Sequence, residues 1–166
     1  MNTQQMISRM TTVLACALGA NLTACAPSSP LLRPPPAPED CPPGAVETME
    51  REFGITVNDT AELSLLTFNE IPRWIRVEEG HAYAMLPGGM GRLPGGSQLK
   101  GRYYFANGRV YARFTKAMIP TGAVYPACIV LTEQYDVPGA EVRAEDGSDA
   151  VQVFSSNFCM AVERFE

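Results

Sequence analysis

Hydrophobic and polar positions along the chain predict a short helix that is followed only by strands. Val46, Met49 and Phe53 recur at the three- to four-residue spacing of one helical face. Two prolines precede this segment and Gly54 follows it, and these are common start and stop signals of helices. We therefore predict a helix over residues 45–53 that ends at the glycine.

From residue 61 onward the pattern changes to short runs of β-branched and aromatic residues bounded by Gly, Pro, Asn and Asp. Eight such runs without intervening helices predict an all-β domain, either a mainly antiparallel sandwich or a partly open barrel. The predicted strands cover residues 61–68, 73–78, 81–86, 99–105, 109–115, 127–133, 150–155 and 158–164.

The segment around Asn107-Gly108 gives the most specific local prediction. Asn-Gly between two alternating runs supplies both left-handed residues of a type I′ turn, which closes a hairpin with Ala106 opposite Arg109. This register sends one set of side chains to the core and the other set to the opposite face of the sheet. The predicted core pairs are Phe105 with Val110, Tyr103 with Ala112, and Gly101 with Phe114. The predicted outer pairs are Tyr104 with Tyr111, and Arg102 with Arg113.

Two further features are expected next to this hairpin. Residues 73–78 and 81–86 are expected to form a second hairpin through Glu79-Gly80. Between the two hairpins, residues 86–96 read LPGGMGRLPGG and contain LPGG twice. Because ordering a loop so rich in glycine has a high entropic cost, we expect this loop to be mobile.

The first 25 residues are organised like an export signal. A polar start with one cation, Arg9, precedes an apolar run over residues 10–22, which is too short to span a bilayer as a permanent helix. The run ends in Leu22-Thr23-Ala24-Cys25, which resembles the lipobox of bacterial lipoproteins. The resemblance implies cleavage before Cys25 and lipidation of this cysteine, and Ala26 in place of an aspartate implies an outer-membrane destination. Two alternatives are cleavage by a type I signal peptidase and an uncleaved, buried helix.

The chain is expected to consist of a lipoprotein signal peptide over 1–24, a lipidated, proline-rich tether over 25–43 and a single β-rich domain over 44–166. Proline-rich segments favour extended polyproline II geometry, so the tether is expected to act as a spacer. A peptide ligand for an aromatic groove is the alternative. The whole chain also resembles small, uncharacterised lipoproteins of Gram-negative bacteria, and this resemblance implies no reaction and no catalytic residues.

Composition narrows the classes of partner. With 166 residues the chain has room for one domain of ordinary size. Its formal net charge of −5 argues against nucleic acid, because nucleic-acid binding depends on a positive field. The membrane is expected as a partner through the lipid on Cys25, with the domain in the periplasm or at the cell surface.

The cysteines and the single histidine predict one disulfide and no catalytic residues. Export would bring Cys41, Cys128 and Cys159 into an oxidising compartment. We expect Cys41 to pair with Cys128, because that bridge would fasten the end of the tether to a strand. Cys159 lies in an apolar run and is expected to stay free, with a cysteine nucleophile as the alternative. His81 is expected on a half-exposed strand face, and neither a metal site nor a cofactor is predicted.

No motif of a hydrolase, a phosphate-binding loop or a kinase occurs in the sequence. The outer face of the Asn-Gly hairpin is the predicted partner surface, because Tyr and Arg are enriched at binding hot spots. An ordinary solvent-exposed sheet face is the alternative. This surface consists of Arg102, Tyr104, Arg109, Tyr111 and Arg113.

We therefore predict a non-enzymatic, membrane-anchored binding module for an envelope protein or glycan. Two other classes of function stay open. One is a small periplasmic hydrolase or inhibitor-type module that uses scattered carboxylates or a cysteine. The other is a purely structural component of the envelope.

Overall fold

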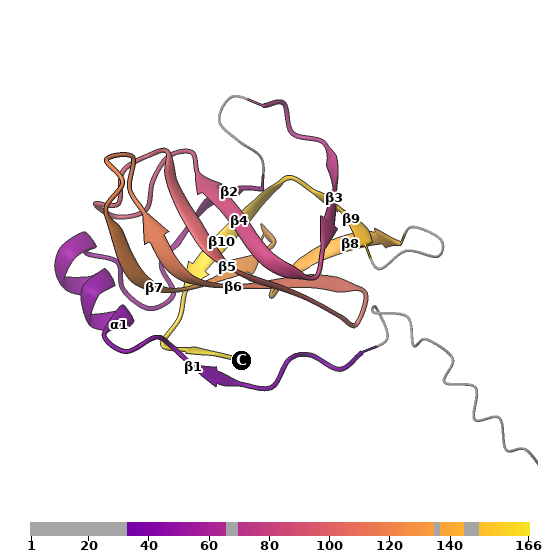
Figure 1. Ribbon diagram of the computed structural model, residues 1–166, viewed down its shortest axis with the longest axis horizontal. Coiled ribbons are helices and arrows are strands. Elements are labelled where there is room, and N and C mark those ends of the chain that lie inside the picture. Colours follow the sequence, from indigo (N-terminus) through magenta and orange to yellow (C-terminus); the bar gives the residue numbers. More distant parts are fainter. Residues whose placement is uncertain (1–32, 66–69, 135–136, 145–149) are drawn as a thin grey trace, which may run out of the picture.

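The structure, a computed structural model, describes residues 33–65, 70–134, 137–144 and 150–166. It confirms the all-β class, with six strands that close into an antiparallel barrel (Figure 1). Around the barrel each strand pairs with the next in the order β2, β4, β5, β6, β7 and β10, and β10 pairs with β2 again. The barrel strands are β2 (Thr60–Ser64), β4 (Gly80–Leu86), β5 (Ser97–Ala106), β6 (Arg109–Met118), β7 (Val124–Thr132) and β10 (Ser156–Ala161).

Three more strands form a small sheet beside the barrel, which we call the wing: β3 (Trp74–Glu78), β8 (Ala140–Ala144) and β9 (Ala150–Phe154). The wing joins the barrel where β8 pairs with the first residues of β6, and it continues through β9 to β3 (Figure 1). Its inner face is apolar, because Val77, Val151 and Val153 are buried in the core. The wing is therefore part of the same folded unit as the barrel.

The predicted hairpin between residues 73–78 and 81–86 is wrong. Gly80 turns the chain with a φ of 120°, but β3 pairs with β9, and β4 pairs with β5 and β2. The physical reason is barrel closure, since β2 and β5 supply the two neighbours of β4. β3 instead pairs with β9 of the wing. β8 was not predicted from the sequence.

The hairpin at Asn107-Gly108 is confirmed in its turn and its register. The two turn residues have φ values of 48° and 73°, and Ala106 lies opposite Arg109. All five predicted cross-strand pairs are present. Gly101 sits at an irregularity in the pairing of β5 with β6, where the two backbones approach each other closely.

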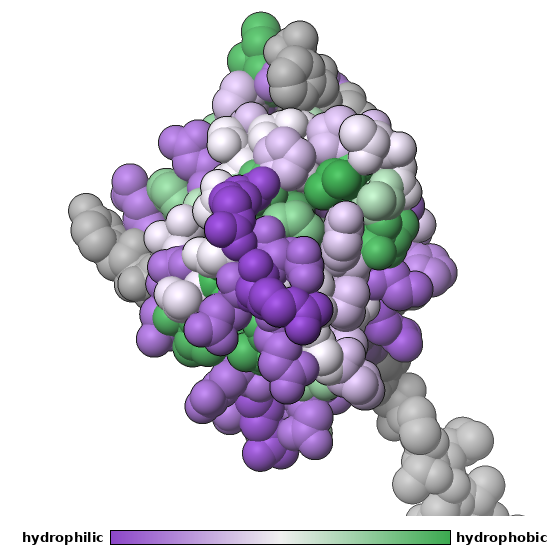
Figure 2. All heavy atoms as spheres, turned by 90° about the vertical axis from the view of Figure 1, so that its left-hand side faces the viewer, coloured by the Kyte–Doolittle hydropathy of each residue, from purple (hydrophilic) through white to green (hydrophobic). Residues whose placement is uncertain are grey.

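The predicted helix is present as α1 (Ala45–Thr48), which continues into a π-helical turn, η2 (Met49–Phe53). It ends at Gly54 in the left-handed conformation, as predicted. Phe53 packs edge to face on Tyr125 of β7 with ring centroids 4.9 Å apart, which fixes the helix to one end of the barrel. Figure 2 views the molecule from the side that carries the helix, where hydrophilic residues cover much of the surface and hydrophobic areas are separated.

The prediction of a mobile loop at residues 86–96 is contradicted by its packing. Met90 and Leu93 are buried in the core and bridge each other through backbone hydrogen bonds. The glycines allow this compact path, because a Cβ atom on Gly89 would lie 2.3 Å from the carbonyl oxygen of Leu93. The entropic cost of ordering these glycines is thus offset by two buried hydrophobic side chains and several backbone hydrogen bonds.

Part of the segment predicted as a tether lies against the domain. Residues 33–41, which we call the strap, run along the outside of the barrel instead of standing away from it (Figure 1). Within the strap, β1 (Glu39–Asp40) pairs with β11 (Arg164–Phe165) near the C-terminus. Prolines cannot donate backbone hydrogen bonds but they retain their carbonyl acceptors, so a proline-rich segment can dock against an arginine.

Candidate functional site

The strap covers one residue of the predicted partner surface on the β5–β6 hairpin, Arg113. Arg113 is buried, and its guanidinium donates hydrogen bonds to the carbonyl oxygens of Pro36, Ala37 and Glu166 at 2.8–3.2 Å. The same group forms an ion pair of 3.2 Å with Glu39. The expectation that Arg113 faces solvent is therefore wrong, because both ends of the domain use it as a common donor.

The other members of that surface do not form one exposed patch either. Arg109 donates to the carbonyl oxygens of Pro138 and Gly139 and forms an ion pair of 2.8 Å with Glu133. Tyr104 and Tyr111 are half-buried, and only Arg102 among the five is exposed. The hairpin face thus works mainly as an internal interface that holds the strap and the β7–β8 connection.

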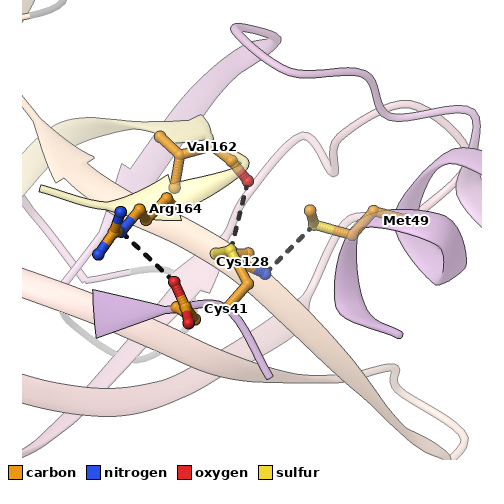
Figure 3. The surroundings of a disulfide bond; sticks show 6 residues. Cys41, Met49, Cys128, Val162 and Arg164 are labelled. Carbon is orange, nitrogen blue, oxygen red and sulfur yellow. Dashed lines mark hydrogen bonds and ion pairs between the residues drawn. A yellow bond between two sulfur atoms is a disulfide. The ribbon is translucent and has the colours of Figure 1, made fainter. Parts of the chain in front are cut away.

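The disulfide in the structure joins Cys41 to Cys128, the pair expected from the sequence, with 5.5 Å between the Cα atoms (Figure 3). It lies between the strap, the helix and β7, where the backbone N–H of Cys128 contacts the Met49 sulfur at 3.4 Å. Arg164 pairs with Asp40 at 3.4 Å beside it. Closing a loop over 87 residues stabilises the fold by about 4.6 kcal/mol in the chain-entropy description.

Cys159 and His81 occupy positions with little catalytic potential. Cys159 is a free thiol that is fully buried, and burial raises its pKa to about 12. A thiol that stays protonated is a poor nucleophile. His81 is exposed on β4 and lines an open cleft of about 490 Å³ between β3 and β4 with Tyr83 and the charged end of β3.

The outer face of the wing carries an aromatic pair that the sequence analysis did not single out. Trp74 of β3 and Phe154 of β9 are cross-strand partners, with ring centroids 5.8 Å apart in an edge-to-face arrangement. Both rings are partly exposed, at 36% and 39%. Arg143 of β8 places its guanidinium 4.1 Å from the centre of the Trp74 ring, and such stacking restricts the ring.

A groove of about 710 Å³ runs from this aromatic pair to the barrel. Trp74 and Phe154 form its wing side, and Phe158 at the start of β10 belongs to its barrel side. Carboxylate, amide and hydroxyl groups also line the groove. The full lining is Trp74, Glu133, Gln134, Val137, Glu141, Phe154, Ser156, Asn157 and Phe158, which we call the wing groove.

The two carboxylates of the wing groove are in different electrostatic states. Glu133 is compensated by Arg109 and also accepts a hydrogen bond from the backbone N–H of Glu141. Within the described residues, the Glu141 side chain has no ion-pair partner and is exposed. The wing groove therefore combines aromatic rings with one carboxylate that forms no ion pair among the described residues.

The strand pairing explains why Trp74, Phe154 and Glu141 come together. Trp74 pairs with Phe154, and the pairing of Val142 with Val153 puts Glu141 beside Phe154 on the outer face. The only sequence signal for this row was the single tryptophan of the chain, which lies between Arg73 and Ile75. Because β8 was not predicted and β3 was paired with the wrong strand, the sequence analysis could not identify the residues that lie next to Trp74.

The described part of the chain contains no cluster of three or more His, Cys, Asp or Glu side chains that could hold a metal ion. None of the helices among the described residues is long and apolar enough to cross a membrane. Comparison with known proteins found no family model that matches the chain and no match among curated proteins.

Proposed function

We propose that this protein is a lipid-anchored, non-enzymatic binding module of the bacterial envelope that takes its ligand in the wing groove. The lipobox-like segment before Cys25 supports the anchor, and the acidic composition argues against nucleic acid as ligand. We do not place the ligand on the β5–β6 hairpin face, because Arg113 is bound by the strap and the C-terminal residue, and Arg109 by the β7–β8 connection.

The observation that carries the proposal is the exposed Trp74–Phe154 pair at the edge of a concave groove. Large aromatic side chains that stay partly exposed beside a depression are typical of ligand sites, since they offer apolar area at a low cost in side-chain entropy. Arg143 and Phe154 hold Trp74 in one orientation. A site that is ordered before the ligand arrives loses less entropy on binding.

The proposal is tested by capture from solubilised envelope with the full-length, detergent-extracted protein. Trp74→Ala is expected to abolish capture of the retained component, because it removes the largest exposed ring of the groove. Tyr83→Ala is the matched control, since Tyr83 is an aromatic residue of β4 that is 58% exposed and does not line the wing groove. Equal capture by wild type, Trp74→Ala and Tyr83→Ala would show that the wing groove is not the site.

One observation favours the hydrolase alternative, namely that Glu133 and Glu141 line the same groove. Glycoside hydrolysis needs two carboxyl groups with separate roles, one of which donates a proton. Glu133 is already engaged by Arg109 and by a backbone N–H, which disfavours a role as proton donor. Release of reducing ends from a polysaccharide by wild type, and its loss in Glu133→Gln, would establish the alternative.

A further inference from the structure

The wing groove combines aromatic ring surfaces with oxygen atoms that can form hydrogen bonds, and this combination favours a glycan over a protein as its ligand. We propose that the wing groove binds an oligosaccharide built from neutral or amino sugars. This inference rests on the proposed function, because it names the ligand class of the same groove.

The aromatic side of the groove fits a sugar ring. A pyranose presents an apolar face of C–H groups, and such a face packs on an aromatic ring. Trp74 lines the groove but Arg143 does not, so the guanidinium supports the Trp74 ring from outside the groove. The ring therefore keeps surface available on the groove side, with Phe154 beside it.

The polar side of the groove fits sugar hydroxyls. Gln134 and Ser156 can both donate and accept, and Glu141 can accept two hydrogen bonds from vicinal hydroxyls. A protein interface that excludes water would have to desolvate the Glu141 carboxylate, which has no ion-pair partner among the described residues, and this desolvation costs free energy. Sugar hydroxyls instead replace the water molecules around it.

The charge of the groove selects among sugars. Arg109 compensates Glu133, so Glu141 is the one charged side chain that lines the groove without an ion pair, while the Arg143 guanidinium lies against the Trp74 ring and does not line the groove. This charge repels uronic acids and phosphorylated sugars and attracts a protonated amino sugar. Its size of about 710 Å³ suits a short oligosaccharide, because small-ligand sites measure roughly 300–1,000 Å³.

Trp74 is the only tryptophan of the chain, so its fluorescence reports directly on this groove. The purified full-length protein in detergent is titrated with tetramers of N-acetylglucosamine, glucosamine and galacturonic acid. We expect a saturable change in emission with the neutral and the cationic tetramer, and at least about tenfold weaker binding of the anionic one, which corresponds to about 1.4 kcal/mol.

Two variants test the roles of the rings and the charge. Phe154→Ala, which keeps the reporter, is expected to weaken binding of both ligands about tenfold. Glu141→Gln is expected to remove the preference for the cationic over the neutral tetramer while it retains neutral binding. Tyr83→Ala should bind like wild type, and an unchanged melting temperature of each variant confirms that its fold is intact.

The outcomes separate this inference from the proposed function. No response to any tetramer, together with Trp74-dependent capture of an envelope protein, would overturn the glycan inference and leave the binding function standing. No response and no Trp74-dependent capture would overturn both. Equal affinity of wild type and Phe154→Ala for the neutral tetramer would also overturn the glycan inference.

Discussion

At the scale of the residue, Gly101 shows how closely β5 and β6 approach. A Cβ atom at this position would lie 1.8 Å from the carbonyl oxygen of Arg113. Because the strap fixes Arg113, the β6 backbone cannot move away without breaking those hydrogen bonds. Gly101→Ala is therefore expected to lower the free energy of unfolding by about 2–4 kcal/mol, measured by urea denaturation.

Gly88→Ala is the control for this prediction. A Cβ on Gly88 meets no atom within 4 Å, so the free energy of unfolding should change by less than about 0.5 kcal/mol. Similar stabilities of Gly101→Ala and Gly88→Ala would mean that the close approach of β5 to β6 does not exist in solution.

Cys159 is a second residue whose surroundings make a measurable prediction. Burial raises its pKa to about 12, above the ordinary value of 9.0, so the native thiol is expected to resist alkylation at pH 8 and to react fully in denaturant. Because the thiol ionises at lower pH in the unfolded chain than in the folded one, its ionisation lowers the free energy of unfolding as pH rises from about 9 toward 12. Rapid labelling of the native protein by iodoacetamide, followed by mass spectrometry, would contradict the buried position.

At the scale of the element, the strap depends on Arg113. This side chain connects the carbonyl oxygens of Pro36, Ala37 and Glu166, so one guanidinium holds the strap and the C-terminus together. Arg113→Met keeps most of the apolar stem but removes the donors. We expect the free energy of unfolding to fall by about 2–4 kcal/mol and amide hydrogen exchange to accelerate in residues 37–41.

Arg102→Met on the same hairpin is the control, because Arg102 is exposed and its loss should change stability by less than about 0.5 kcal/mol. Unchanged exchange in the strap of Arg113→Met would show that the disulfide and the pairing of β1 with β11 hold this segment without Arg113. The disulfide fixes only Cys41, the last residue of the strap. The residues in which hydrogen exchange accelerates therefore distinguish the contribution of the disulfide from that of Arg113.

Local turn chemistry predicted one hairpin of this sheet correctly and another wrongly. Asn107-Gly108 specifies a turn geometry in which only one register is compatible with the buried side chains, so its pairing followed from sequence. Glu79-Gly80 only permits a change of direction, and the partner of β3 was decided by long-range closure of the barrel. The short β8, with Val142 as its one large hydrophobic residue, carries too weak a signal to be recognised alone.

At the scale of the whole molecule, the predicted class of fold was correct, whereas two arginines of the predicted partner surface, Arg109 and Arg113, are engaged within the domain. The alternation of apolar and polar residues along β5 and β6 predicted which face of the hairpin points outward. No local pattern could show that the strap and the C-terminal residue bind Arg113 on this face. The wing groove depends on Trp74, Phe158 and Glu141 from three distant segments. Such a site becomes recognisable only when the order of the strands is known.

The proposed lipid anchor is the property of the whole molecule on which the proposed envelope function depends. If Cys25 carries the lipid, Arg33 at the start of the strap can lie no more than about 29 Å of extended chain from it, so the barrel would stay close to the membrane. We expect the intact mass of the native protein to begin at Cys25 with acyl chains, and Cys25→Ala to leave the membrane fraction. Cys16→Ala, a matched change within the apolar run, should leave anchoring intact. A mass that begins at Met1 without lipid would remove the export signal, the tether and the envelope ligand together, whereas the barrel and its wing groove would be unaffected.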